Sequence, residues 1–288
     1  MDIRALLMGL SFVLMWSSAF TSARIAVAYA SPLLLLSVRF LISGLLAMAI
    51  AKMLGQRIAL TRKQWVAVAL FGLLQNGVYL GANFVAMQWI EAGLAAIIAS
   101  LLPLLVALLS WVFFKERLPA LGVLGLFAGL VGVLIIMGSR LSGGADITGV
   151  ALAFMGVGAL SIATLLVRGA ASSGNVLMVV GLQMMVASAA LFPASLVFET
   201  WHVEWTWQLI TAFSYTTIVP GVMATLVWFL LVNRIGAIRA SSFHFLNPFL
   251  GVAIAAAIVG ESLNAQDLVG VAVITVGIVA VQLSKRKQ

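Results

Sequence analysis

Three large polar side chains recur at fixed spacing inside an apolar run of this sequence. Gln75, Tyr79 and Asn83 follow one another at intervals of four residues, which places them on one face of a helix. Asn76 flanks that face, seven residues before Asn83. Amides and a phenol can donate and accept hydrogen bonds to a small ligand, whereas packing alone satisfies three such groups poorly. The stripe therefore predicts the lining of a polar cavity.

Smaller polar groups form similar stripes in three other apolar runs. By run, the stripes are Ser17, Thr21 and Arg24; Ser161, Thr164 and Arg168; and Ser214, Thr217, Gly221, Thr225 and Trp228. A hydroxyl in an apolar helix either lines a pathway or bonds to its own or a neighbouring helix, and both alternatives stay open here. The candidate lining residues taken from these runs are Ser17, Thr21, Ser161, Thr164, Ser214, Thr217 and Trp228.

Trp16 and His244 are further candidates because of their depth. Trp16 lies about 11 residues into its run, or roughly 17 Å deep, and its ring either contacts a substrate or packs internally. His244 is the one histidine inside an apolar run, and Asn247 follows it. This histidine either binds a carboxylate or carries a proton, or it is neutral and bonded between helices. We count Trp16, His244 and Asn247 as candidates for the cavity lining.

Isolated charges inside or beside apolar runs call for a partner. Arg39 lies about seven residues into its run, where a charge is costly, so it reaches the outer interface, pairs with a residue such as Glu91, or attracts an anion. Glu116 and Glu261 each stand just before a new run. A carboxylate in that position is expected to stabilise the positive N-terminus of the following helix.

Enzyme chemistry is the weaker alternative. Ser241 and His244 have the spacing of a nucleophile and a base, but the sequence shows no aspartate to orient the histidine, no G-x-S-x-G motif and no metal-binding cluster. The absence of cysteine excludes disulfides, thiolate metal sites and a cysteine nucleophile. We expect no enzyme activity, catalytic residue, metal or cofactor.

The composition shows which solvent surrounds these residues. Apolar residues make up 64% of the chain and charged residues 8%, with a mean hydropathy of +1.20, whereas soluble domains are about half apolar and a quarter charged. Lipid must therefore solvate most of the chain, as transmembrane helices. We predict ten such helices, near residues 5–27, 32–53, 65–88, 92–113, 119–138, 148–168, 175–198, 208–232, 237–259 and 264–284.

The basic residues predict how the helices are oriented. Ten spans place both termini on one side, and with that side in the cytoplasm most basic residues flank cytoplasmic helix ends. They are Arg4, Lys52, Arg57, Arg62, Lys63, Lys115, Arg117, Arg168, Arg234, Arg239, Lys285, Arg286 and Lys287. Arg140 alone lies opposite, and Arg24 and Arg39 lie in or near spans. Because cytoplasmic loops carry the excess of Lys and Arg, we predict cytoplasmic termini. The net charge of +8 lies at run ends and not on a basic face, so we expect no nucleic-acid partner.

A short passage occurs twice in the chain. Four residues of VFFKERLPALGVLG (112–125) match AIVGESLNAQDLVG (257–270) at an offset of 145. The matched pairs, with two further pairs at the same offset, are Glu116/Glu261, Leu118/Leu263, Ala120/Ala265, Gly125/Gly270, Pro103/Pro248 and Gly132/Gly277. Each half holds five spans, an odd number, so the second copy enters the membrane from the opposite face. Inverted repeats of this kind are typical of secondary transporters, which bind their substrate where the repeats meet.

With the P-x12-E pattern in both halves and a later glycine-rich helix, the chain resembles the drug/metabolite transporter superfamily, with paired EamA-type domains over about 5–139 and 147–284. Within it, the chain resembles YddG-like exporters of amino acids, notably aromatic ones. The resemblance implies an all-α membrane protein with ten helices around a central cavity, and export from the bacterial cytoplasm across the inner membrane. Relatives in the superfamily also carry purines, nucleotide sugars and cationic drugs, so these solutes stay as alternatives.

The expected mechanism is alternating access by an uncoupled or weakly coupled carrier. No Asp or Glu lies in the middle of a predicted span, and proton-coupled carriers usually need an intramembrane carboxylate or histidine. A passive channel is the alternative. Pro103, Pro220, Gly221 and Pro248 are candidate hinges because they interrupt helices. The expected partners are a small-molecule substrate and the lipid bilayer, and the chain is expected to be a monomer.

Overall fold

The computed structural model describes residues 3–115, 119–142, 144–166, 175–235, 243, 246–262 and 264–285. These residues form helices, and their one β-bridge joins Ala30 to Val203. In chain order the elements are α1 (Ile3–Val27), α2 (Pro32–Met53), α3 (Arg62–Phe71), η1 (Gly72–Tyr79), α4 (Leu80–Ala86), α5 (Ala92–Ala99), α6 (Leu102–Phe114), α7 (Ala120–Ser142), α8 (Ile147–Leu166), α9 (Val176–Phe198), α10 (Trp207–Ile218), η2 (Val219–Met223), α11 (Ala224–Ile235), α13 (Asn247–Val259) and α14 (Ala265–Lys285).

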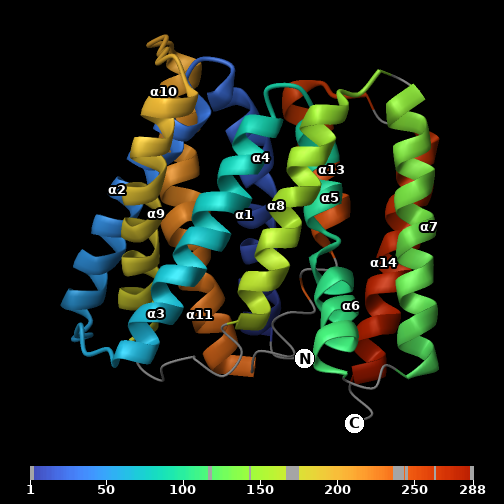
Figure 1. Ribbon diagram of the computed structural model, residues 1–288, viewed down its shortest axis with the longest axis horizontal. Coiled ribbons are helices and arrows are strands. Elements are labelled where there is room, and N and C mark those ends of the chain that lie inside the picture. The colour runs from blue at the N-terminus through green and yellow to red at the C-terminus, as the bar shows by residue number, and fades with distance from the viewer. Residues whose placement is uncertain are drawn as a thin grey trace.

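The structure confirms an all-helical chain with several candidate membrane spans. Among the described residues, eight helices are long and apolar enough to cross a membrane, and α13 and the 265–281 part of α14 are shorter apolar helices. The count of ten spans stays a prediction. Both termini lie at the lower end of the molecule in Figure 1, which we call the terminal end, and we call the opposite end the distal end.

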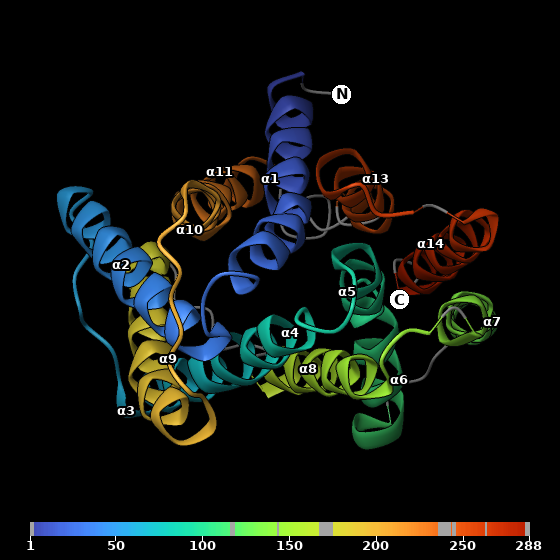
Figure 2. The same cartoon turned by 90° about the horizontal axis from the view of Figure 1, so that it is seen from above.

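Two tightly packed helix pairs stand at opposite sides of the molecule. Viewed from above, α2 lies against α9 on one side and α7 against α14 on the other, and the remaining helices lie between them (Figure 2). These are the second and fifth long helices of each half of the chain. Each half therefore contributes one helix to each pair.

Glycines bring α7 and α14 into backbone contact. A Cβ on Gly125 would lie 2.6 Å from the carbonyl oxygen of Gly277, and a Cβ on Gly132 would lie 2.8 Å from that of Gly270. An offset of 145 residues exchanges these two pairs, since it relates Gly125 to Gly270 and Gly132 to Gly277. The fifth helices of the two halves thus pack as a local two-fold, which is why the repeat preserves these glycines.

Reciprocal polar contacts join α2 and α9 along their length. The hydroxyl of Ser37 donates to the carbonyl of Ser188 at 3.3 Å, and the hydroxyl of Ser188 donates to the carbonyl of Ser37 at 2.9 Å. Hydroxyls buried in this way satisfy themselves on the facing backbone and fix the helix register.

The ends of the same pair are capped across the interface. At the distal end, Glu199 accepts from the backbone N–H groups of Leu33 and Leu34, at 2.7 and 3.0 Å. At the terminal end, the Gln56 side chain accepts from the N–H of Met178 at 3.0 Å. Leu33 and Met178 are 145 residues apart, so each second helix has its orphan N-terminal amides satisfied from the end of the other.

The helices that bear the polar stripes are interrupted at matching places. The third long helix of the first half contains the π-helical segment η1, and its counterpart contains η2 around Pro220 and Gly221. The sequence predicts the second interruption, because proline removes a backbone donor, but not the first.

The other two proline hinge candidates stand at helix starts. Pro103 lies at the start of α6, after a break from α5, and Pro248 lies at the start of α13. A hinge role for any of these prolines stays a prediction.

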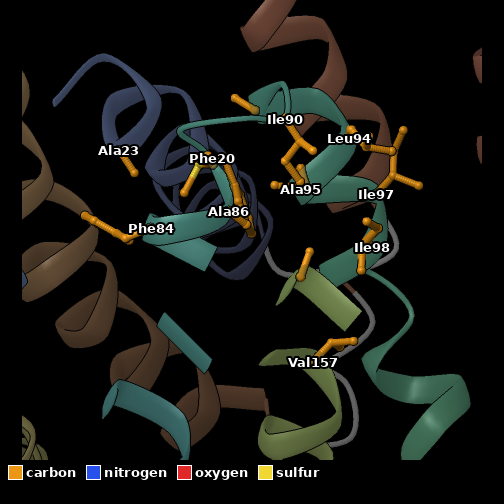
Figure 3. Close-up of a cluster of buried hydrophobic side chains, with 14 of the residues drawn as sticks. Phe20, Ala23, Phe84, Ala86, Ile90, Leu94, Ala95, Ile97, Ile98 and Val157 are labelled. Atoms are coloured by element: carbon orange, nitrogen blue, oxygen red, sulfur yellow. The ribbon is translucent and has the colours of Figure 1, made fainter. Parts of the chain in front are cut away.

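An apolar cluster fills the distal half between the first and second halves of the chain. Figure 3 shows side chains of α1, α4, α5 and α8 converging there, among them Phe20, Phe84, Leu94 and Val157. Each of these four side chains is less than 10% exposed. The described side chains therefore form a closely packed core in this part of the molecule.

Candidate substrate cavity

A cavity of about 480 Å³ opens among the central helices. Its lining begins near the terminal end, with Leu60, Gln64 and Val176, and ends in the distal half with Ala23 and Met87, at the apolar cluster. The volume lies within the usual range of small-molecule sites, roughly 300–1,000 Å³. Both halves of the chain contribute lining residues.

Nine of the candidate lining and hinge residues from the sequence line this cavity. They are Trp16, Gln75, Asn76, Tyr79, Asn83, Thr164, Pro220, Gly221 and Trp228. The whole stripe of Gln75, Tyr79 and Asn83 is among them, although η1 widens the helix there. The structure therefore gathers the large polar groups of the sequence around one space.

Most of these polar groups have no hydrogen-bond partner among the described residues. Among the described residues, none hydrogen-bonds the Gln75 or Asn76 carboxamide or the Tyr79 hydroxyl. Asn83 donates from Nδ2 to the carbonyl of Tyr79 at 2.8 Å, and its Oδ1 is buried without a partner. Buried polar groups are nearly always bonded, so unbonded groups around a cavity mark a place for a polar ligand or water.

The smaller hydroxyls behave differently. Ser161 donates to the carbonyl of Val157 at 2.7 Å, and Thr217 donates to that of Phe213 at 2.6 Å, within their own helices. Thr164 also bonds its own helix, at 2.8 Å to Leu160, although it lines the cavity.

Four further described candidates, Ser17, Thr21, Ser214 and Asn247, are not part of the cavity lining. Ser17 donates to Oδ1 of Asn247 at 3.3 Å, which ties α1 to α13. Thr21 is buried outside the lining, and Ser214 is on the exposed face of α10. His244 lies outside the described residues.

Three polar lining residues, Gln64, Gln183 and Thr216, were not singled out in the sequence. Arg39, noted there as an isolated charge but not as a candidate lining residue, also lines the cavity. Gln183 stands alone in the middle of an apolar helix, and a lone carboxamide at that depth is a signal that the sequence offered. Thr225 belongs to a stripe noted in the sequence and also lines the cavity.

Arg39 is the charged residue of the described lining. Its side chain is 6% exposed, and its Nε donates to the carbonyl of Thr216 at 3.2 Å. The guanidinium carbon lies 5.3 Å from the ring centroid of Phe40 and 5.9 Å from that of Phe84. The sequence leaves three alternatives open for Arg39. This geometry fits neither a side chain that reaches the outer interface nor one that pairs with Glu91, which leaves the attraction of an anion.

Aromatic rings supply much of the apolar lining. Phe12 stands between two indoles, with ring centroids 5.7 Å from Trp16 and 4.8 Å from Trp228. Because Trp16 and Phe12 come from α1 and Trp228 from α11, the aromatic wall joins the two halves of the chain. Such a wall can receive a flat ring or an apolar side chain.

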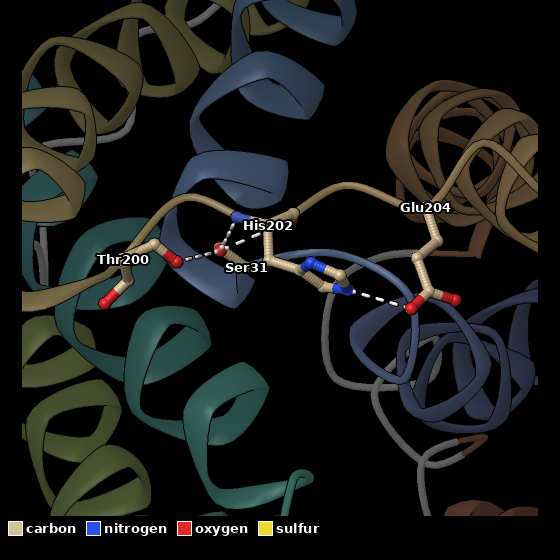
Figure 4. Close-up of polar contacts among 4 residues, drawn as sticks. All are labelled: Ser31, Thr200, His202 and Glu204. Carbon is tan, nitrogen blue, oxygen red and sulfur yellow. Dashed lines mark hydrogen bonds and ion pairs between the residues drawn. The ribbon is translucent and has the colours of Figure 1, made fainter.

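Hydrogen bonds join two loops at the distal end, and we call this set of contacts the polar clasp. Ser31 donates from its hydroxyl to the carbonyl of Thr200 at 3.2 Å and accepts from the N–H of His202 at 2.9 Å (Figure 4). The His202 ring and Glu204 lie 3.1 Å apart beside it. The clasp joins the loop after α1 to the loop after α9, so it links the two halves of the chain across this end.

Glu261 closes the same end by a contact that the sequence did not predict. Its two carboxylate oxygens accept from the N–H groups of Ala92 and Gly93, at 2.7 and 2.8 Å, so it caps α5 and not the helix that follows it. That following helix, α14, has its own acceptor, because Asp267 accepts from the N–H of Asn264 at 3.1 Å. The expectation for Glu261 was therefore wrong in its target. Glu116 lies outside the described residues.

Comparison with known proteins agrees with this architecture. The profile of the EamA-like transporter family matches residues 3–138 and 147–283. The chain is 26% identical to the uncharacterized transporter YvbV of Bacillus subtilis (strain 168), over 96% of this chain and 90% of that one. It is 29% identical to the uncharacterized inner membrane transporter YedA of Escherichia coli (strain K12), over 94% and 88%.

A solved crystal structure has the same fold. It superimposes with a TM-score of 0.70 at 21% identity and covers the whole of both chains. Because the family profile spans both halves of the sequence and the fold agrees, this chain belongs to the EamA-like transporter family.

Proposed function

We propose that this membrane transporter exports amino acids, aromatic ones included, from the bacterial cytoplasm across the inner membrane. The observation that carries the proposal is the set of unbonded amides and the unbonded phenol around the cavity, next to an aromatic wall. Amides can hold the polar end of an amino acid, and rings can hold its side chain. The resemblance to YddG-like exporters points to the same substrate class.

The proposal includes an orientation. With two inverted five-helix repeats, 5–139 and 147–284, and ten spans, the terminal end faces the cytoplasm. Arg57, Arg62 and Lys63 all lie there, at and before the start of α3, in agreement with the excess of basic residues on cytoplasmic loops. In that orientation the cavity is closed to the outside by the distal clasp and by Glu261.

Alternating access then requires the distal contacts to break and the terminal end to close. No described residue of the cavity lining is an Asp or Glu, and this agrees with transport down the substrate gradient without proton coupling. A rocking movement of one repeat against the other would expose the same cavity to the outside.

Counterflow in proteoliposomes tests the proposal. Vesicles loaded with an unlabelled amino acid should take up labelled L-phenylalanine faster than empty vesicles, with saturation, and neutral amino acids should compete. An imposed pH gradient should drive no uphill accumulation. Counterflow of purines or organic cations in place of amino acids would refute the substrate class, uptake that does not saturate would indicate a channel, and accumulation driven by pH would refute the uncoupled mechanism.

A further inference from the structure

Arg39 places a fixed positive charge in the wall of the cavity. It is the eighth residue of α2, so it lies about 10 Å along the helix from the distal start. Its described neighbours are a carbonyl and two phenyl rings, and none is an acid. A charge removed from water needs an opposite charge or a well-ordered set of hydrogen bonds. Arg39 has one such bond.

The Arg39 side chain has N–H donors that no described residue uses. Arginine carries five N–H donors, and in Arg39 only Nε–H is bonded to a described residue. The four N–H groups on the two Nη atoms have no described acceptor. The bond to Thr216 and the rings of Phe40 and Phe84 hold the guanidinium in place. A planar fork held in this way matches the two oxygens of a carboxylate.

We propose that Arg39 binds the carboxylate of the substrate, so that a transported solute must carry an anionic group. This inference rests on the proposed function and names the group that the cavity recognises. It follows from the position of an arginine with unbonded N–H groups in a lining without described acids. Organic cations without a carboxylate are rejected by the same charge.

Asn83 offers a complementary acceptor. Its Oδ1 has no hydrogen-bond partner among the described residues, and Asn83 lines the same cavity as Arg39. An amide oxygen accepts from an ammonium group, so a solute with an ammonium close to its carboxylate uses both residues. An α-amino acid has this arrangement, and its side chain is left to the aromatic wall.

Three related probes separate the contributions of the two charged groups. L-Phenylalanine carries both, 3-phenylpropionate only the carboxylate, and phenethylamine only the ammonium. In counterflow of labelled L-phenylalanine, 3-phenylpropionate is expected to compete and phenethylamine is not. Arg39→Gln should weaken L-phenylalanine and 3-phenylpropionate by roughly ten- to a hundredfold, as for hydrogen bonds to a charged group, without weakening phenethylamine. Arg39→Lys should restore part of the loss.

One control tests whether the loss of any positive charge has the same effect, and another tests whether each variant is folded. Arg57→Gln removes an equal charge from the exposed terminal end, where the backbone and not the side chain bonds Asn175, and should leave both competitors unchanged. Thermal unfolding of each purified variant shows whether it is folded. If Arg39→Gln does not fold, competition by 3-phenylpropionate and by phenethylamine on the natural chain still decides, because stronger competition by phenethylamine overturns the proposal.

The two proposals fail in different ways. If the natural chain and a folded Arg39→Gln variant transport L-phenylalanine with equal affinity, the carboxylate site is refuted and amino-acid export stands. If no amino acid is transported, but 3-phenylpropionate raises the unfolding temperature of the natural chain and not of Arg39→Gln, amino-acid export is refuted and the anion site stands. The absence of both effects refutes both proposals.

Discussion

At the residue scale, Gly221 keeps the neighbourhood of Arg39 open. A Cβ there would lie 3.0 Å from Oγ of Ser43, 3.2 Å from the carbonyl oxygen of Thr216 and 3.7 Å from Nη2 of Arg39. Gly221→Ala is therefore expected to displace the carbonyl that holds Arg39 and to raise the KM for L-phenylalanine by about three- to tenfold. Gly158→Ala is the control, because a Cβ at Gly158 meets no atom within 4 Å. An equal KM for both variants would contradict this prediction.

A hydroxyl without a protein partner can be removed without loss of stability. Tyr79→Phe deletes such a group from the cavity, so we expect an unchanged unfolding temperature and a KM for L-phenylalanine raised by about two- to tenfold. Tyr215→Phe is the matched control, because the Tyr215 hydroxyl lies 2.7 Å from Oγ of Ser18 outside the cavity. It should lower the unfolding temperature and leave KM unchanged. The opposite pattern in the two variants would show that the Tyr79 hydroxyl is structural.

The residues also show how far a site can be predicted from sequence. Gln75, Tyr79 and Asn83 were recognisable because large polar groups are not fully satisfied along their own helix: Asn83 bonds the Tyr79 carbonyl through Nδ2, and its Oδ1 stays unbonded among the described residues. Ser161 and Thr217 were not assignable, because a short hydroxyl can bond the carbonyl four residues earlier, as both do. Arg39 required the structure, since the sequence cannot say which way a long side chain reaches.

At the element scale, Glu261 is a cross-repeat cap whose loss should loosen the distal end. Gln in its place can accept one backbone N–H of α5 but opposes the other with its own NH₂ group. Glu261→Gln is therefore expected to lower the free energy of unfolding by about 1–2 kcal/mol, measured by thermal or denaturant unfolding in detergent. Glu204→Gln, on the exposed side of the clasp, should cost less. Equal losses in the two variants would contradict a special role for the cap.

Periodicity and composition predicted the helices themselves, because lipid admits few alternatives for a chain this apolar. The offset of 145 relates the glycines at which the backbones of α7 and α14 touch, although the sequence did not predict that contact. It did not anticipate η1, which contains no proline, or the target of Glu261. Both depend on contacts between segments distant in sequence, which local patterns do not record.

At the scale of the whole molecule, orientation can be tested directly because the chain has no cysteine. Lys63→Cys, at the terminal end, should react with an impermeant maleimide only when the cytoplasmic face is accessible, as in inverted membrane vesicles. Glu204→Cys, at the distal end, should react in intact spheroplasts. Both positions are exposed, so neither substitution disturbs a packed site. Labelling of both residues from one face would end the proposal of cytoplasmic termini.

Alternating access predicts that the distal end must open during transport, and one pair of positions can prevent this. Ala30 and Val203 face each other in an antiparallel bridge flanked by the Ser31–His202 and Tyr29–Glu204 backbone bonds. Residues paired in this way have Cα atoms about 4.5 Å apart, within reach of a disulfide. Ala30→Cys with Val203→Cys should therefore abolish counterflow under oxidising conditions, and a reductant should restore it.

The single variants should be insensitive to oxidation, because each lacks a partner thiol. The cavity is lined from the terminal end, so the oxidised double variant should still be stabilised against heating by the substrate that the natural chain transports. Loss of transport with retained binding is the result expected of a carrier that must break its distal clasp in every cycle. Undiminished counterflow with a quantitatively formed disulfide would show that substrate crosses without opening this end, and alternating access through it would have to be abandoned.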